Sequence, residues 1–202
     1  MYILFPLSAS ILQLYLSGTP ILAPATITGF FLVFINIQNS QINTDTLTGL
    51  NNRRSAFNYL DDQIRLTTDK KSTSVYMIDV NYFKEINDTW GHIEGDHALN
   101  IIGSALKNFS QKYNLFVARF GGDEFMIIRD CNCDVSDKII VDSFRTILAD
   151  TCRNNDLKYD ISVSIGYAKT SHQNISLYQL IEQADAMLYK EKQEFHKKHN
   201  CM

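Results

Sequence analysis

Acidic side chains stand at the tip of a predicted hairpin. Asp123 and Glu124 follow a Gly-Gly pair at 121–122, between the apolar runs 115–118 and 125–128. Two short β-prone runs around two glycines predict a hairpin, and glycine lets the chain turn tightly and lets a bulky polar ligand approach the main chain. Adjacent carboxylates repel each other unless a cation lies nearby, so the pair predicts a divalent-metal site. The alternative is a solvated hairpin whose acidic residues keep a sheet edge soluble.

A third carboxylate, Asp79, closes the apolar run Ser74–Ile78. This run predicts a buried strand with the carboxylate at its C-terminal end, where ligand groups commonly lie in α/β folds. If the strand neighbours the hairpin, three carboxylates surround one point. Oxygen ligands of that charge favour Mg²⁺ or Mn²⁺ over zinc, and such ions serve phosphoryl transfer by neutralising phosphate charge.

Hydrophobic periodicity predicts the elements that position these side chains. In chain order we expect a helix carrying Phe57, Leu60 and Ile64, the strand 74–78, a loop with a short helix over 81–96, a helix over about 97–113, the hairpin, a helix carrying Ile139, Ile140, Phe144 and Ile147, a strand over 159–167 and a helix from about Ser176. This order predicts an α/β (α+β) fold with a mostly antiparallel central sheet flanked by helices.

The N-terminal stretch from Met1 to Thr44 contains no Asp, Glu, Lys, Arg or His. Two apolar segments, 2–17 and 19–37, predict a transmembrane helical hairpin over residues 1–38, followed by a connector over 39–44. The arginines soon after it place the following domain in the cytoplasm, and the protein at the inner membrane, by the positive-inside tendency. The alternative is a buried helical pair in a soluble protein. The abrupt start is also consistent with the tail of a larger membrane sensor.

Charge and cysteine usage exclude other classes. The net charge of -3 and a pI near 5.9 imply no general attraction to nucleic acid. The 4 cysteines show neither the density of a disulfide scaffold nor a metal-ligand spacing. We expect them to be reduced thiols in a cytosolic domain.

Five segments in order carry a resemblance to a known family. They are 45–54, 79–96, 119–125, 162–167 and 184–192, and the chain from about Asp45 to Lys192 resembles the GGDEF family of diguanylate cyclases. The resemblance implies a GGDEF catalytic domain over 45–202, with a fold similar to the palm of nucleotidyl cyclases. It implies condensation of two GTP molecules into cyclic di-GMP with release of two pyrophosphates, in signal transduction by a bacterial second messenger.

The resemblance also implies roles for single residues. Metal would be held by Asp79, the main-chain carbonyl of Val80, Asp123 and Glu124. Asp123 or Glu124 would help to deprotonate the 3′-hydroxyl that attacks the α-phosphate. A cation is needed there because a carboxylate is a weak base for a hydroxyl.

Guanine would be read by Asn87 and Asp96, since an Asp accepts from the guanine N1–H and exocyclic amine and an Asn pairs with the remaining edge. His92 lies between them. Phe83, Lys84 and Lys192 would meet the phosphates. The substrate-binding residues that the resemblance implies are Phe83, Lys84, Asn87, His92, Asp96, Gly121, Gly122 and Lys192.

Three departures from the family pattern matter. Asn81 replaces a frequent second Asp, which removes one charge. His196 stands where a phosphate-binding arginine is usual, so triphosphate affinity is expected to fall unless Lys197 or Lys198 substitutes. The positions of an Arg-x-x-Asp product-inhibition site hold 112–115, Lys-Tyr-Asn-Leu, so we expect no product inhibition through that site.

Because each domain binds one GTP and the product joins two, catalysis implies a homodimer, with cyclic di-GMP receptors downstream. Two alternatives remain at this point. One is a catalytically silent GGDEF-type nucleotide-binding signalling module, although Asp79, Asp123 and Glu124 are all present. The other is a cyclase that makes a mononucleotide product from one GTP.

Overall fold

The computed structural model describes residues 22–67, 72–131, 135–155, 157–170 and 175–199. The chain divides into two compact units, residues 1–43 and residues 44–202.

The first unit contributes helix α2, Leu22–Asn43. The helix runs through the predicted second apolar segment and on through the connector, and its last two turns, from Asn36 to Asn43, are mostly polar. Several large apolar side chains are exposed on it, including Phe30 and Phe31. Within the described part of the chain, no helix is long and apolar enough to span a bilayer. The expected transmembrane hairpin is therefore not seen, and its first segment, 2–17, lies outside the described residues.

The second unit is built on a five-stranded sheet with the strand order β1-β3-β4-β2-β5. Neighbouring strands are antiparallel except β1 and β3, which are parallel. The expected mostly antiparallel sheet is confirmed. The strands are β1 Asn51–Asn52, β2 Ser72–Val80, β3 Phe116–Arg119, β4 Glu124–Cys131 and β5 Val163–Lys169.

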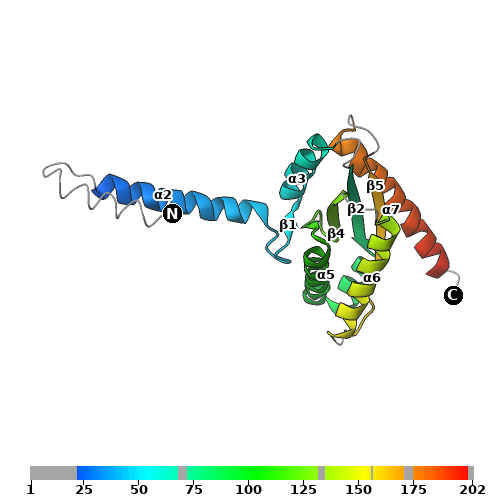
Figure 1. Ribbon diagram of the computed structural model, residues 1–202. Helices are drawn as coiled ribbons and strands as arrows, with labels where there is room; N and C mark the ends of the chain where they lie inside the picture. The colour runs from blue at the N-terminus through cyan, green and yellow to red at the C-terminus, as the bar shows by residue number, and fades with distance from the viewer. Residues whose placement is uncertain (1–21, 68–71, 132–134, 156, 171–174, 200–202) are drawn as a thin grey trace. The chain divides into compact units, whose positions relative to one another are not determined.

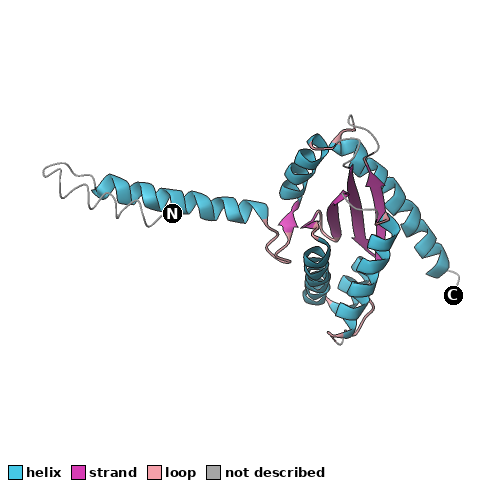
Figure 2. Ribbon diagram, viewed as in Figure 1, coloured by secondary structure: helices cyan, strands magenta, loops and turns pink. Residues whose placement is uncertain are grey.

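Helices cover both faces of this sheet, as Figure 2 shows. One core cluster joins the sheet to α5 and α6, and a second joins its other face to α3 and α7. Alternate residues of β2 divide between the two clusters, with Tyr76 and Ile78 in the first and Val75 and Met77 in the second, because successive strand side chains point to opposite faces. The helices are α3 Arg53–Arg65, α4 Phe83–Trp90, α5 His92–Tyr113, α6 Asp137–Arg153 and α7 Leu177–His199.

Two expected boundaries were wrong. The long helix begins at His92 and not near His97, because the break after α4 is made by Gly91 alone, at φ +87°, and Gly95 lies inside α5. The last strand begins at Val163 and not at Tyr159, because Tyr159 turns to α5 and donates its hydroxyl to the carbonyl of Glu94 at 2.8 Å. The two-residue strand β1 was not expected.

Helix α7 lies unusually close to the edge strand β5, to the right of the sheet in Figure 1. A Cβ atom on Gly166 would lie 2.1 Å from the Leu188 nitrogen and 2.2 Å from the Ala184 carbonyl oxygen. Only glycine allows two backbones to approach so closely. The contact fixes the height of α7 above the sheet one turn before Lys192.

Candidate functional site

The register of β2 and β4 brings the predicted carboxylates together. Asp79 of β2 lies directly opposite Glu124 of β4. The next residue, Val80, donates its main-chain N–H to the carbonyl of Asp123 at 3.2 Å. The expectation that the strand end meets the hairpin tip is therefore met.

Asp79 is nearly enclosed, with 8% of its side chain exposed, and its Oδ2 lies 2.5 Å from the Nζ of Lys192 on α7. Burial raises the pKa of the Asp79 carboxyl, the Lys192 ammonium lowers it, and the charges of Asp123 and Glu124 raise it again, leaving it above the ordinary value. A buried carboxylate beside two others is costly without positive charge. Lys192 supplies one such charge.

The donor set fits a hard divalent cation, since carboxylate and carbonyl oxygens are the ligands that Mg²⁺ and Mn²⁺ prefer. Asp79, Asp123 and the main-chain carbonyl of Val80 are the groups that would hold it, and the pairing of β2 with β4 brings their residues together at one end of the sheet. However, among the residues that the structure describes, no three His, Cys, Asp or Glu side chains converge closely enough to hold a metal. Glu124 is turned toward Gly121, where a Cβ would lie 2.5 Å from Glu124 Oε2. The three carboxylates are neighbours but do not converge on one point.

The glycines of the hairpin tip meet only part of what the sequence predicted for them. Neither Gly121 nor Gly122 has a φ in the left-handed region, so the turn does not require glycine for its backbone angles. A Cβ on Gly122 would meet nothing within 4 Å, whereas the space beside Gly121 is taken by the Glu124 carboxylate. Gly122 therefore leaves the main chain open, as the prediction of close ligand approach requires.

Arg119 anchors the hairpin tip, a role that the sequence did not reveal. Its Nη2 and Nε donate to the carbonyl of Gly122 at 2.7 and 3.1 Å, and its Nη1 lies 3.2 Å from both carboxylate oxygens of Asp45. Asp45 also accepts from the main-chain nitrogen of Thr48 at 2.8 Å and from its hydroxyl at 2.7 Å. A chain of hydrogen bonds therefore runs from residue 45 to the hairpin tip within residues 119–125, which we call the signature loop.

The predicted guanine readers lie on two adjoining helices. Asn87 is on α4, and His92 and Asp96 are on α5. A Cβ on Gly95 would lie 2.0 Å from Asn87 Oδ1, so the Asn87 amide rests against α5 beside Asp96. Asp96 is exposed and Asn87 is half-buried, while His92 is exposed at the start of α5. Their assignment to guanine stays a prediction.

The residues predicted to bind the phosphates differ in how far they are buried. Phe83 packs partly against the core below α5 and α6, and Lys84 is exposed. Between β2 and α4, Tyr82 adopts φ +56°, which few non-glycine residues do. Its ring lies 5.1 Å from that of His196 on α7, edge to face. The last turns of α7 therefore reach the start of α4.

Asn81, the departure next to the carboxylates, is buried and points to β5. Its Nδ2 donates to the Ser162 hydroxyl at 3.2 Å, and its Oδ1 accepts from the Ser164 hydroxyl at 2.7 Å. These bonds tie the end of β2 to β5. The amide donates to one hydroxyl and accepts from the other. An ionised carboxylate, which only accepts, would keep both partners only if the Ser162 hydroxyl rotated to donate.

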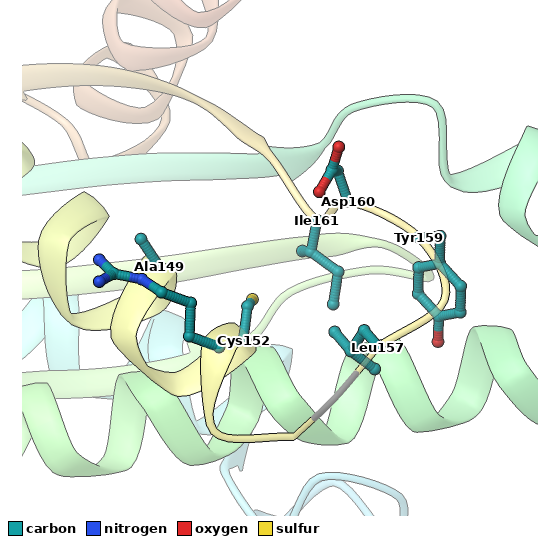
Figure 3. Close-up of a pocket in the computed structure, with 7 residues that line it drawn as sticks. Ala149, Cys152, Leu157, Tyr159, Asp160 and Ile161 are labelled. Carbon is teal, nitrogen blue, oxygen red and sulfur yellow. The ribbon is translucent and has the colours of Figure 1, made fainter.

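A cavity of about 380 Å³ lies elsewhere, between the end of α6 and the segment that leads to β5. Figure 3 shows Ala149 and Cys152 of α6 facing Leu157 and Ile161 of that segment. Burial raises the pKa of the Cys152 thiol, which keeps it a neutral, weakly reactive group. None of the predicted site residues lines this cavity.

A family model described as "Diguanylate cyclase, GGDEF domain" matches residues 42–198. The chain is 30% identical over 171 residues to Diguanylate cyclase A of Treponema denticola, covering 80% of this chain and 46% of that protein. It is 35% identical over 156 residues to Signaling protein YkoW of Bacillus subtilis, covering 74% of this chain and 19% of that protein. The chain thus spans less than half the length of these curated relatives.

Among solved structures, the chain is similar to the coiled coil and GGDEF domain of DgcB from Caulobacter crescentus in complex with c-di-GMP. The TM-score is 0.72 at 26% identity, covering 86% of this chain and 93% of that one. The family match begins in the last turn of α2 and ends in the last turn of α7, so it takes in nearly all of the second compact unit. The chain therefore belongs to the family of GGDEF diguanylate cyclase domains.

Proposed function

We propose that the protein is a diguanylate cyclase that condenses two GTP molecules into cyclic di-GMP and two pyrophosphates. The observation that carries this proposal is the register that sets Asp79 beside Glu124, with Asp123 at the adjoining hairpin tip. A domain that had lost catalysis would have no need to keep three mutually repelling carboxylates at the end of one strand pair. Family membership and the similarity to Diguanylate cyclase A support the same reaction.

Each residue set has one task in this proposal. Asn87 and Asp96 bind guanine, and Lys192 with Lys84 binds the phosphates. Asp123 or Glu124 accepts the proton of the 3′-hydroxyl of one GTP. The hydroxyl oxygen then forms a bond to the α-phosphorus of the second GTP, and the bond from that phosphorus to the pyrophosphate oxygen breaks. Two such steps close the ring and release two pyrophosphates. Mg²⁺ or Mn²⁺, when bound at Asp79, Asp123 and Val80, neutralises phosphate charge.

A homodimer follows from the stoichiometry, because one domain presents one GTP and each bond joins two. The two copies would place their GTP molecules face to face, with receptors of cyclic di-GMP acting downstream. Any change that raises or lowers the population of the dimer with its two GTP molecules face to face would then regulate the rate of cyclic di-GMP formation.

We also propose a location at the inner membrane with the catalytic domain in the cytoplasm. The support is the lack of any Asp, Glu, Lys, Arg or His from position 1 to position 44. Fractionation of cells that express the full chain tests this, and recovery of the protein in the soluble fraction at low salt would rule it out.

Incubation of the purified full chain with GTP and Mg²⁺, followed by chromatography of the nucleotides, tests the reaction. Asp123→Asn removes one charge at the hairpin tip, and Asp142→Asn, on the exposed side of α6, is a matched control. Cyclic di-GMP is expected from the wild type and Asp142→Asn but not from Asp123→Asn or after chelation of the metal. GTP binding without product would favour the silent signalling module, and a mononucleotide product would indicate the one-GTP cyclase.

A further inference from the structure

Helix α7 carries two adjacent charged side chains that contact different strands. Lys192 pairs with Asp79 on β2. Glu191 contacts β5 instead, where its Oε2 accepts from the main-chain nitrogen of Ile165 at 3.1 Å. The other oxygen of Glu191 pairs with Arg145 on α6. Since Ile165 and Ser164 lie opposite Ile78 and Asp79 in the sheet, the two contacts lie almost level along the strands.

The hydrogen bond to Ile165 is made on the open side of β5. This strand ends the sheet, with β2 as its neighbour. The Ser162 carbonyl and the Thr170 nitrogen both bond toward β2, so the odd-numbered residues between them direct their main-chain groups outward. Glu191 therefore supplies to Ile165 the acceptor that a further strand would supply.

At this level, a cavity of about 740 Å³ lies between α6 and α7 and is lined by Val141, Tyr167 and Met187, with Arg145 and Glu191 on its walls. The ion pair between Arg145 and Glu191 crosses this space. Beyond the close contact at Gly166, the Glu191 carboxylate is thus a direct link between α7 and both β5 and α6.

We propose that Glu191 is a positioning residue for nucleotide binding, which fixes the last turns of α7 so that Lys192 points at Asp79 and the triphosphate. The inference rests on the proposed function, since it assigns Lys192 to the phosphates. Adjacent helix residues lie about 100° apart around the axis. A carboxylate held on the outer side of β5 therefore sets the rotation that directs the next side chain over the sheet. The competing view is that Glu191 only protects the edge of β5 from pairing.

The test compares Glu191→Ala with Glu194→Ala in the full chain, by calorimetric titration with a GTP analogue that carries a methylene group between the α- and β-phosphorus, in the presence of Mg²⁺. Both variants remove one carboxylate from α7 and introduce the best helix former, and Glu194 is exposed. We expect Glu191→Ala to weaken binding about tenfold, the range of one lost charge-assisted hydrogen bond. Glu194→Ala should stay within about twofold.

A double-mutant cycle separates positioning from simple loss of structure. If Glu191 acts through Lys192, Glu191→Ala should change the affinity of a Lys192→Ala protein by less than about twofold, because the group that it positions is gone. Glu191→Gln, which keeps an acceptor for Ile165 but not the charge for Arg145, guards against misfolding of the alanine variant and should give an intermediate loss.

The possible outcomes distinguish this inference from the proposed function. Equal affinities of Glu191→Ala and Glu194→Ala overturn the positioning role and leave the proposed function intact. So does a tenfold loss that is undiminished in the Lys192→Ala protein. If the wild type does not bind the analogue at all, the proposed function fails and this inference falls with it.

Discussion

At the scale of single residues, Asp45 is the first acidic side chain of the sequence and the one that ties the opening of the domain to the signature loop. Burial by itself would raise its pKa, but the hydrogen bonds from Thr48 and the charge of Arg119 outweigh this, and the pKa of the Asp45 carboxyl is lowered. Arg119 also donates a hydrogen bond to the carbonyl of Gly122. The loop that bears Asp123 is therefore held by charge as well as by the hairpin.

Asp45→Asn is expected to lower the free energy of unfolding by about 1 kcal/mol near neutral pH. The lowered pKa means that the ionised carboxylate stabilises the folded state. This contribution is complete above the unfolded pKa and is lost as the pH falls through the folded pKa. Urea unfolding of both proteins should therefore show a gap in stability near neutral pH that closes as the pH falls below 3.8, the ordinary pKa of an aspartate, and through the lowered pKa of Asp45. A gap that does not change with pH would contradict the ionic role.

The hydroxyl of Tyr76 links strand β2 to helix α6. It donates to Asp137 of α6 at 2.5 Å, and the Nη1 of the buried Arg129 lies 3.5 Å from both groups. Burial and the Asp137 charge raise the pKa of Tyr76, so it stays a neutral donor.

Tyr76→Phe should lower the free energy of unfolding by about 1–2 kcal/mol. The Asp137 carboxylate would lose the hydrogen bond from the Tyr76 hydroxyl, and of these two partners only Arg129 would remain. Tyr178→Phe, at a side chain that is 70% exposed, is the control and should change stability by less than about 0.5 kcal/mol. Thermal unfolding followed by circular dichroism measures both. Equal stability of the two variants would show that the short contact to Asp137 contributes nothing.

At the scale of elements, the close approach of α7 to β5 is the contact on which the phosphate side of the site depends. Gly166 provides it, and Lys192 follows Leu188 by one turn on the same helix. A change at this glycine would move the helix, since the atoms that a Cβ would meet belong to backbone and cannot rotate away.

Gly166→Ala is expected to destabilise the domain by about 3 kcal/mol, at the upper end of the range for overpacking, and to weaken binding of the GTP analogue by displacing Lys192. Gly122→Ala is the matched control for stability, because a Cβ there meets nothing within 4 Å and the residue has no left-handed φ. Urea unfolding compares the two. A Gly166→Ala protein as stable as Gly122→Ala would mean that the helix can shift at little cost.

The sequence predicted those elements whose apolar pattern is local. Strand β2 and the hairpin were predicted because runs of β-prone residues end at Asp79 and surround the glycines. The start of α5 was missed because two glycines, Gly91 and Gly95, look alike in sequence, and only packing against Asn87 shows that the second is helical.

The candidate site was predicted from contiguous motifs, and the structure confirms that Asp79 lies beside the hairpin tip that bears Asp123 and Glu124. The assignment of Asn87 and Asp96 to guanine stays a prediction. The partners that hold them were not predicted. Arg119 with Asp45, Lys192 with Asp79 and Asn81 with Ser164 are separated by 74, 113 and 83 residues, and no local pattern encodes such pairs. The membrane hairpin was predicted from the lack of charge and from two apolar segments, and the described part of α2 does not meet that expectation.

At the scale of the whole molecule, the second unit contains all the residues assigned to the reaction, but one copy holds only one GTP in the proposed reaction. Product formation should therefore depend on encounter of two copies. The first unit ends at residue 43, two residues before Asp45.

We expect the rate of cyclic di-GMP formation per milligram of protein to rise with protein concentration until the dimer predominates. Measurement of initial rates over about a hundredfold range of concentration, with sedimentation velocity on the same samples, tests this. A constant specific rate in samples that sediment as monomers would rule out the two-copy site.

Mass-spectrometric analysis of the products from GTP and Mg²⁺ shows whether the carboxylates at the end of β2 and β4 form a two-GTP cyclase site. Cyclic di-GMP and two equivalents of pyrophosphate are expected from the wild type, and neither from Asp123→Asn. Undiminished product from Asp123→Asn, or none from a wild type that binds GTP as a dimer, would contradict the two-GTP cyclase site at these carboxylates.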